Sequence, residues 1–219
     1  MTSLRTIGFL IAGIPLLGGC QALETAFAEP AKVTTPSSAS TATAMALPAT
    51  LTIPPVSVGD EWSYSDGYAL RVTEVRPDGV AKYDRLDAEG QWFISRALFK
   101  EESQSRKVHR VIVYRTGNPM DLLSAKINQP VTYIREYMRD RELIRHRTSW
   151  VIEGKEKITV PAGTFDAWIL VMRTQSLDSN WRGFERWYYS PAVKNYVRME
   201  YKYGEGAHGS RVLMTYKVK

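Results

Sequence analysis

The chain has 219 residues, of which 44% are hydrophobic, and its single cysteine is Cys20. This length favours one domain with an added tail, and a lone cysteine excludes an intrachain disulfide. Lys and Arg outnumber Asp and Glu by 29 to 23, which gives a net charge of +6. This charge would attract an anionic lipid or an acidic glycan, and the alternative is that it serves solubility alone.

The first residues have the composition of a secretory signal peptide. Arg5 precedes the apolar run 7–17, and small residues follow it. The run is shorter than the roughly 20 apolar residues of a membrane span. The ending Leu17-Gly18-Gly19-Cys20 resembles the bacterial lipobox. This resemblance implies a lipoprotein signal peptide over 1–19 and acyl chains such as palmitate on Cys20, which tether the protein to a membrane.

The expected compartment is the bacterial cell envelope. Gln21 rather than Asp follows the cysteine, and the resemblance to bacterial lipoproteins therefore implies the outer membrane, facing the periplasm. Export argues against a nucleic-acid partner. The alternative is cleavage after Ala28, because Ala26-Phe27-Ala28 is an A-x-A site; the product would be soluble, periplasmic or secreted.

Residues 20–55 are predicted to be a disordered linker. They are mostly Ala, Ser, Thr and Pro, a composition that cannot bury enough apolar surface to fold. The linker is expected to be a flexible tether between the lipid and a single antiparallel β domain over 56–219.

The domain has the pattern of an all-β protein. Short alternating runs are separated by turn signals such as Arg76-Pro77-Asp78-Gly79. One short helix is predicted over 120–126, with Asn118 as its cap and Pro119 at its first position. We predict a curved antiparallel sheet, half-barrel or β-sandwich-like. The expected strands are 61–66, 68–75, 80–87, 91–99, 108–115, 131–138, 143–153, 156–160, 164–174, 184–189, 195–203 and 211–218.

Two segments of the domain resemble a known signature. Val160-Pro161-Ala162-Gly163-Thr164-Phe165 and Trp187-Tyr188-Tyr189-Ser190-Pro191 resemble the VPAGTF…WYSP pattern of uncharacterised bacterial envelope proteins, many of them lipoproteins. The resemblance covers about 127–203. It implies a half-barrel of the lipoprotein-carrier (LolA-like) kind, and it carries over no catalytic residue, because the family has none established.

The aromatic part of this signature has two interpretations. Trp187, Tyr188 and Tyr189 could line a ligand groove and stack on sugars or acyl chains. The alternative is that they belong to the core, as aromatic stripes in β proteins commonly do. Pro161 and Gly163 are typical of a turn before a buried strand and are expected to be structural.

The densest charge lies in 135–147, where Arg139, Arg141, Arg145 and Arg147 form a candidate anion patch. Guanidinium groups bind phosphate and carboxylate in a bidentate manner. Acidic residues are interleaved with them, so salt bridging on a solvated hairpin is the alternative.

The sequence offers no recognisable catalytic centre. It lacks H-E-x-x-H, G-x-S-x-G, Walker A and G-x-G-x-x-G motifs, and we expect no cofactor and no metal. His109 and His146 lie between arginines and are expected on exposed strand faces, whereas His208 lies in a Gly-rich turn. The carboxylates of the strand-rich half, Asp166, Glu185 and Glu200, could approach one another across a sheet.

The leading hypothesis is a non-catalytic envelope lipoprotein, a tethered β domain that binds a lipid, a glycan or an envelope protein in the periplasm. A hydrolase acting on cell-wall or surface polysaccharide is one alternative and would need two converging carboxylates. A structural accessory of an envelope export or secretion assembly is the other. An interior cavity of about 300 Å³ or more would favour a small ligand.

Overall fold

The structure is a computed structural model, and it describes residues 49–219. The predicted signal peptide 1–19, Cys20, the Ala28 site and most of the 20–55 linker lie outside the described residues. Within 49–219 the chain is all-β, with two short 3-10 helices, which confirms the predicted fold class. No helix among these residues is long and apolar enough to span a bilayer.

The first half of the described chain holds short strands. They are β1 (Glu61–Tyr64), β2 (Ala69–Val75), β3 (Val80–Arg85), β4 (Trp92–Arg96), β5 (Phe99–Ser105), β6 (Val108–Val111) and β7 (Val113–Arg115). The second half holds longer strands and ends at the C-terminus. They are β8 (Val131–Arg139), β9 (Glu142–Val160), β10 (Gly163–Ser176), β11 (Arg182–Ser190), β12 (Asn195–Tyr203) and β13 (Gly209–Lys217).

Some predicted element boundaries were wrong. The two strands expected at 143–153 and 156–160 are one strand, β9, because the residues around Gly154 form a bulge opposite Ile169 and Leu170. The strand expected at 91–99 turns back at Ala97, which has a φ of 50°.

The short helix lies where the sequence places it, but it is a 3-10 helix. It is η1 (Pro119–Ser124), and the Asn118 side chain accepts a hydrogen bond from the Met120 N–H at 3.0 Å. The second 3-10 helix, η2 (Pro191–Val193), follows β11 directly, because Pro191 cannot donate to a sheet ladder.

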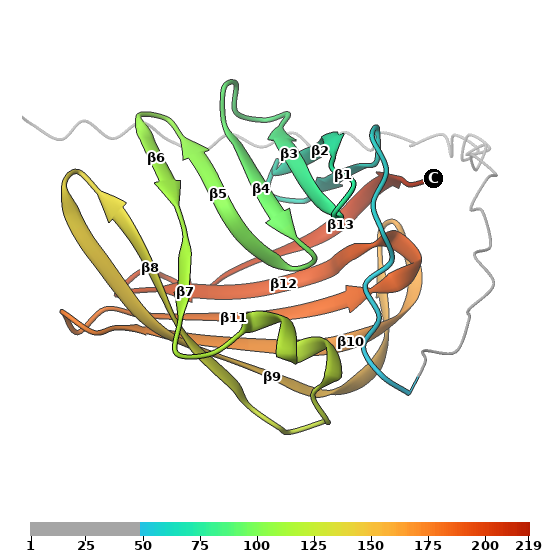
Figure 1. The fold of residues 1–219 in the computed structure, drawn as a ribbon. Coiled ribbons are helices and arrows are strands. Elements are labelled where there is room, and N and C mark those ends of the chain that lie inside the picture. The colour runs from blue at the N-terminus through green and yellow to red at the C-terminus, as the bar shows by residue number, and fades with distance from the viewer. Residues whose placement is uncertain (1–48) are drawn as a thin grey trace, which may run out of the picture. The chain divides into compact units, whose positions relative to one another are not determined.

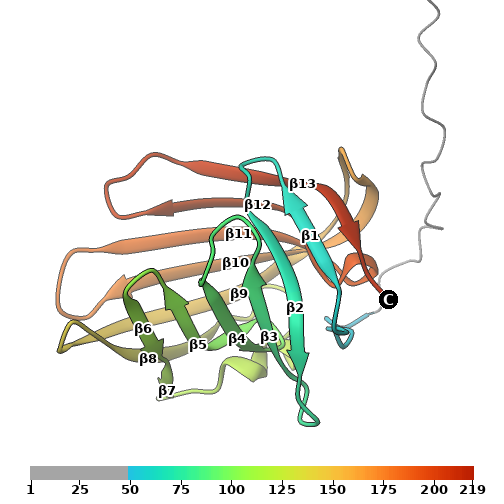
Figure 2. The ribbon, with the colours of Figure 1, turned by 90° about the horizontal axis from the view of Figure 1, so that it is seen from above.

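One antiparallel sheet contains all the strands, and it curls into a nearly closed barrel (Figures 1 and 2). Its order is β6-β5-β4-β3-β2-β1-β13-β12-β11-β10-β9-β8-β7. The strands at its two ends, β6 and β7, are consecutive parts of the run 108–115, which we call the seam strand. β6 pairs with β5, and β7 pairs with β8. Between them, the Ile112 N–H donates to the Glu101 carbonyl at 2.8 Å.

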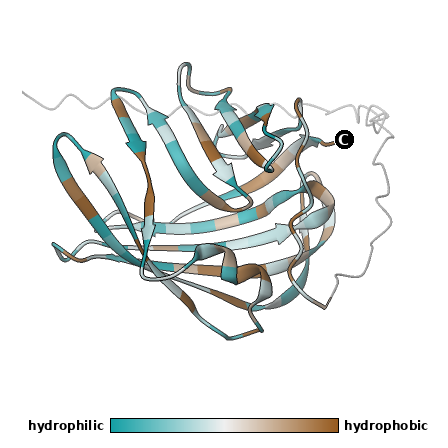
Figure 3. Cartoon of the chain, in the orientation of Figure 1, coloured by the Kyte–Doolittle hydropathy of each residue, from teal (hydrophilic) through white to brown (hydrophobic). Residues whose placement is uncertain are grey.

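Alternation along the strands decides which side chains enter the barrel. Hydrophobic and hydrophilic residues alternate along several strands in Figure 3. One buried cluster gathers around Trp62, Tyr64 and Leu213 of the first and last strands, and the other around Trp150 and Trp168 of β9 and β10. The half-buried Trp187 packs against both clusters.

The packed part of the chain begins before residue 56, the predicted start of the domain. Leu51 is only 3% exposed and belongs to the cluster around Trp150, and Ile53 packs beside it. The last residues of the predicted linker therefore contribute to the core.

Asp60 holds three distant parts of the chain together. This carboxylate is fully buried and accepts hydrogen bonds from the backbone N–H groups of Ser57 and Lys219, each at 2.9 Å. The Nζ of Lys194, next to η2, lies 3.2 Å from the same carboxylate. Asp60 thus joins the entry to β1, the end of η2 and the last residue.

Candidate functional site

The concave side of the barrel holds an interior cavity of about 560 Å³ that is open to solvent. Ligand sites in proteins have volumes of about 300–1,000 Å³, so this space is large enough for a small organic molecule. Residues from both halves of the sheet form its wall, together with η1 and the entering segment 53–56. The aromatic and apolar side chains of the wall include Tyr68, Tyr83, Phe93, Trp187, Tyr196 and Met199.

Paired rings make part of this wall. The ring centroids of Tyr83 and Phe93 lie 4.8 Å apart, nearly parallel at 9°. The rings of Trp187 and Tyr196, which also line the cavity, lie 5.2 Å apart and are tilted at 55°. Such contacts fix the positions of the rings, so the cavity has preformed flat surfaces suited to an apolar or ring-containing ligand.

Lys100 is the cation of the cavity wall that has no carboxylate partner within ion-pair distance in the described part of the chain. Its side chain is accessible to solvent, yet burial is the main cause that lowers the pKa of its ammonium group. Both facts fit a group that faces a solvent-filled interior space. Its Nζ lies 4.5 Å from the centroid of the Phe93 ring, so the charge sits directly beside the apolar wall.

Two arginines also reach the cavity, but they already have partners. The Cζ atoms of Arg85 and Arg211 lie 4.2 and 4.1 Å from the centroid of Tyr68, one ring between two guanidinium groups. Arg85 forms an ion pair with Asp87, and Arg211 forms one with Asp66 at 3.0 Å. These arginines fix Tyr68, and they leave Lys100 as the group best placed to receive a new anion.

Glu185 is the half-buried acid of the cavity wall whose charge acts on Lys100. Its two oxygens accept hydrogen bonds from the Trp187 Nε1–H, at 2.7 Å, and from the Tyr203 hydroxyl. A negative charge beside the Tyr203 hydroxyl adds to burial, which is the main cause that raises the pKa of Tyr203. Tyr203 therefore stays a neutral donor, and Glu185 is an acceptor already satisfied by protein groups.

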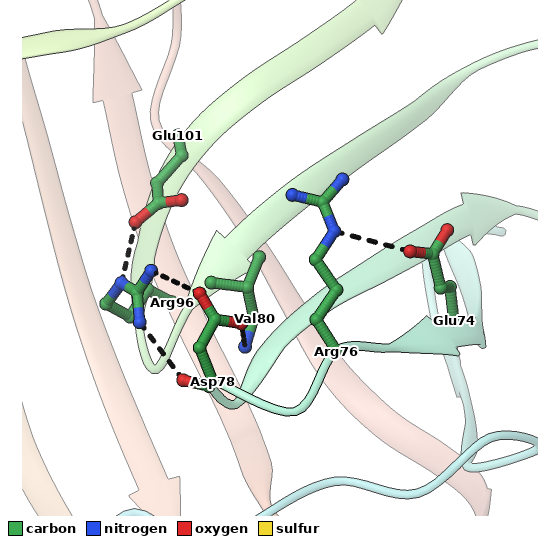
Figure 4. A network of polar contacts seen from close by, with 6 residues as sticks. All are labelled: Glu74, Arg76, Asp78, Val80, Arg96 and Glu101. Carbon is green, nitrogen blue, oxygen red and sulfur yellow. Dashed lines mark hydrogen bonds and ion pairs between the residues drawn. The ribbon is translucent and has the colours of Figure 1, made fainter.

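The turns that border the cavity are linked by a polar network (Figure 4). Arg96, at the turn after β4, contacts the Asp78 carboxylate in the turn after β2, with Nη2 and Oδ2 separated by 2.9 Å. The Arg96 Nε lies 2.9 Å from Glu101 of β5. The hydrogen bond from Arg96 is the main cause that lowers the pKa of Asp78, which also accepts from the Val80 N–H at 3.3 Å.

The structure places the three residues of the predicted aromatic groove in different environments. Trp187 lines the cavity, as a groove residue would. Tyr188 and Tyr189 are 7% and 0% exposed and belong to the two buried clusters instead. The two tyrosines point to opposite faces of β11, and at that point each face is covered by one of the two clusters.

The four arginines of the predicted anion patch also lie in different environments. Arg139 lies 3.4 Å from Glu142, and Arg145 lies 2.6 Å from Asp178, so both side chains are in ion pairs. Arg141 lies in the exposed turn between β8 and β9 and has a φ of 71°. Arg147 points to a separate hollow of the surface, with other cations.

One predicted exposure was wrong: His146 is 5% exposed and therefore buried. Its ring stacks on Trp181, with centroids 4.8 Å apart, and its Nδ1 has no hydrogen-bond partner within the described part of the chain. Burial is the main cause that lowers the pKa of His146 to about 4, and Arg135 and Arg139 lower it further. His109, in contrast, is exposed and lies 2.7 Å from Glu102.

The candidate carboxylates do not form a pair. Of the three, Glu185 alone lines the cavity. Asp166 lies 2.9 Å from the Lys157 ammonium, and Glu200 contacts Arg198 at 2.5 Å. Within residues 49–219, no group of three or more His, Cys, Asp or Glu side chains could hold a metal ion.

Sequence reasoning missed Lys100, the arginines at Tyr68 and the Asp60 contacts. Lys100 follows Phe99 in a strand with an otherwise polar pattern, so periodicity alone assigns it to the solvent side. A turn at Arg96-Ala97-Leu98 is the signal that could have identified Lys100. Such a turn reverses the chain and begins a new strand, in which the alternation between the two sheet faces starts again.

Comparison with known proteins gives structural similarity alone. No family model and no curated protein matches the sequence. The fold is similar to that of the hypothetical lipoprotein YmcC from Escherichia coli K12, with a TM-score of 0.49 and 10% identity, over 71% of this chain and 83% of that chain. It is also similar to a Bacteroides fragilis protein described as exported, with a YmcC-like fold, at a TM-score of 0.41 and 18% identity, over 74% and 97% of the two chains. At these identities the similarity concerns the course of the chain, and no residue role is transferred.

Proposed function

We propose that this protein is a non-catalytic lipoprotein of the bacterial envelope that holds a small amphiphilic ligand with an anionic group in its interior cavity. The observation that carries the proposal is the cavity of about 560 Å³, in which the ammonium group of Lys100 lies against apolar walls and has no carboxylate partner among residues 49–219. The envelope location rests on the Leu17-Gly18-Gly19-Cys20 sequence.

The chemistry of the wall defines the ligand. A carboxylate, phosphate or sulfate would form a charge-assisted hydrogen bond with Lys100, and such bonds are stronger than neutral ones. An acyl chain or fused ring system would contact Phe93, Tyr83 and Met199, where apolar burial contributes about 25 cal/mol per Å². An uncharged sugar could stack on the rings, but it would bring no counter-ion to Lys100.

A catalytic role is not part of the proposal, and the polar contacts of the two carboxylates that line the cavity support this choice. Glycoside hydrolysis uses two carboxylates about 5–10 Å apart across the substrate. Glu185 is held by Trp187 and Tyr203, and Asp78 at the border of the cavity is held by Arg96.

The first experiment is native mass spectrometry of the protein purified from bacterial membranes. The expected spectrum shows acyl chains on Cys20 and a bound anionic amphiphile that is lost at higher collision energy. An unlipidated chain that begins at Glu29 would contradict the proposed anchor. A lipidated chain that never carries a small molecule would contradict the proposed ligand.

The second experiment measures the displacement of a fluorescent fatty acid. The Lys100→Met variant keeps the length and apolar stem of the side chain and loses its charge, and we expect about a tenfold weaker affinity for the fatty acid. Lys107→Met removes the same charge from the exposed turn after β5 and should bind as the unsubstituted protein does. Equal affinity for Lys100→Met and Lys107→Met would show that the cavity does not receive an anion at Lys100.

A further inference from the structure

A second hollow lies on the opposite face of the sheet from the cavity. Glu185 and Tyr203 line the interior cavity, and alternation along β11 and β12 therefore turns Phe184 and Lys202 to the other face. There, a groove of about 770 Å³ crosses strands β8 to β12. We call it the outer groove.

The sheet register arranges the groove residues in two rows across the strands. In one row, Arg173 of β10 lies between Ser149 and Phe184, and Phe184 lies opposite Lys202. In the next row, Gln175 lies between Arg147 of β9 and Arg182 of β11. Because neighbouring strands are about 4.8 Å apart, the two cations of each row are separated by about 10 Å.

The outer groove carries an excess of positive charge without partners. Four cationic side chains line it, namely Arg147, Arg173, Arg182 and Lys202, and Glu205 is its single acid. Only Arg173 has a carboxylate nearby, and this carboxylate, Glu153, lies 3.8 Å away and binds Arg186 more closely, at 2.7 Å. Among the described residues, Arg147, Arg182 and Lys202 form no ion pair.

This excess is local rather than a property of the whole surface. Arg139 and Arg145, on the same hairpin as Arg147, are paired with Glu142 and Asp178. Unpaired like charges at two-strand spacing repel one another, which costs stability that an anion in the groove would restore. The arrangement therefore points to a ligand with several negative charges.

Neutral polar groups lie between the cations. Thr132, Gln175 and Asn180 are exposed in the groove, and they can donate to and accept from hydroxyl groups. The ring of Phe184 is half-buried beneath Arg173, whose Cζ lies 5.8 Å from the ring centroid. Hydroxyl-binding amides, guanidinium forks and an aromatic surface together suit sugars that carry acidic groups.

We propose that the outer groove binds a segment of an acidic polysaccharide, laid across strands β8 to β12. The carboxylate or phosphate groups of the polymer contact Arg147, Arg173, Arg182 and Lys202, and its hydroxyl groups contact the amides between them. A hollow fits a single polymer chain, whereas a flat anionic membrane would contact only its margins. The groove is separate from the interior cavity, and the proposal does not depend on the ligand there.

The test uses the full lipidated protein in non-ionic detergent and oligogalacturonate as the probe, with dextran of matched length as the neutral control. Isothermal titration at two salt concentrations measures the affinity. We expect binding of oligogalacturonate that weakens as salt rises, because surface charges are screened, and no binding of dextran. Binding of dextran with equal affinity would overturn the proposal.

Matched variants locate the site. Arg147→Gln with Arg182→Gln removes two groove cations, and we expect at least a tenfold loss of affinity for oligogalacturonate. Arg139→Gln with Arg141→Asn removes the same charge at the β8–β9 turn, and the affinity should stay within twofold of the unsubstituted protein. An equal loss in both double variants would show attraction by net charge and no site at the groove.

Competition experiments distinguish an acidic polysaccharide from other polyanions as the ligand of the outer groove. Vesicles of phosphatidylglycerol should displace oligogalacturonate no better than vesicles of phosphatidylcholine, since the lipid anchor inserts into both. Stronger displacement by phosphatidylglycerol would assign the groove to an anionic membrane, and equal binding of single-stranded DNA would make it a general polyanion surface. Either result would overturn the proposal.

Discussion

Replacement of Asp60 tests how the fold is closed around its cavity. The carboxylate is fully buried, and it accepts from two backbone N–H groups and from Lys194, whose side chain is 11% exposed. Asp60→Ala removes the carboxylate from the Lys194 ammonium and leaves it the hydrogen bond that it donates to the Lys219 backbone oxygen at 2.7 Å. Asp60→Asn keeps the size and one acceptor oxygen, whereas it removes the charge and puts an NH2 donor in place of the other oxygen.

The expected loss follows from the burial of both partners. Removal of one member of a buried ion pair costs about 3–5 kcal/mol, and the midpoint of thermal unfolding of a domain of this size shifts by about 2–4 °C per kcal/mol. Asp60→Ala should therefore lower this midpoint by roughly 6–20 °C. Asp60→Asn should cost less, about 1.5–3 kcal/mol, the value of a hydrogen bond to a charged group.

Urea unfolding, monitored by tryptophan fluorescence, measures these differences. Adding Lys194→Met to Asp60→Ala removes the uncompensated charge and should recover part of the lost free energy of unfolding. The matched control is Arg139→Ala, which breaks an exposed pair with Glu142 and should cost less than about 1 kcal/mol. If Asp60→Ala costs no more than Arg139→Ala, the buried carboxylate does not hold the chain segments together.

Three further predictions follow from burial and polar contacts. Burial lowers the pKa of His146 to about 4, so as the pH falls this residue is protonated in the unfolded chain before it is protonated in the folded one. The free energy of unfolding should therefore fall by up to about 3 kcal/mol between pH 6.5 and 4. Urea unfolding at several pH values should show that the free energy of unfolding of His146→Gln depends less on pH. Leu213→Ala, at a fully buried site, should cost about 2–5 kcal/mol in the same assay, whereas Met214→Ala, at a site 42% exposed, should change stability by less than about 0.5 kcal/mol; similar losses would contradict the assigned sheet faces. Asp78→Ala should speed hydrogen exchange at the Val80 amide, and an unchanged rate would mean that the contact does not protect it.

The sequence predicts the fold class well because turn chemistry and alternation are local properties. Arg76-Pro77-Asp78-Gly79 forms the turn between β2 and β3, with Gly79 at a φ of 81°. The break expected near Gly154 did not occur, since a bulge absorbs the extra residue inside one long strand. Local patterns do not distinguish a bulge from a turn.

The candidate sites were less predictable because they depend on which strands become neighbours. Arg147 and Arg182 are far apart in the sequence, and only the pairing of β9, β10 and β11 places them beside the same residue, Gln175. Lys100 enters the cavity because the chain reverses at Ala97. A short stretch of sequence shows neither which strands pair nor which face of the sheet Lys100 occupies.

The seam strand has a consequence for solubility. Exposed sheet edges present unpaired N–H and C=O groups and invite other chains to add a strand, which leads to aggregation. Here 108–115 pairs with β5 through its first part and with β8 through its second part. Both margins of the sheet are thereby held by one continuous peptide, which shortens the open edge that a second copy of the protein could pair with.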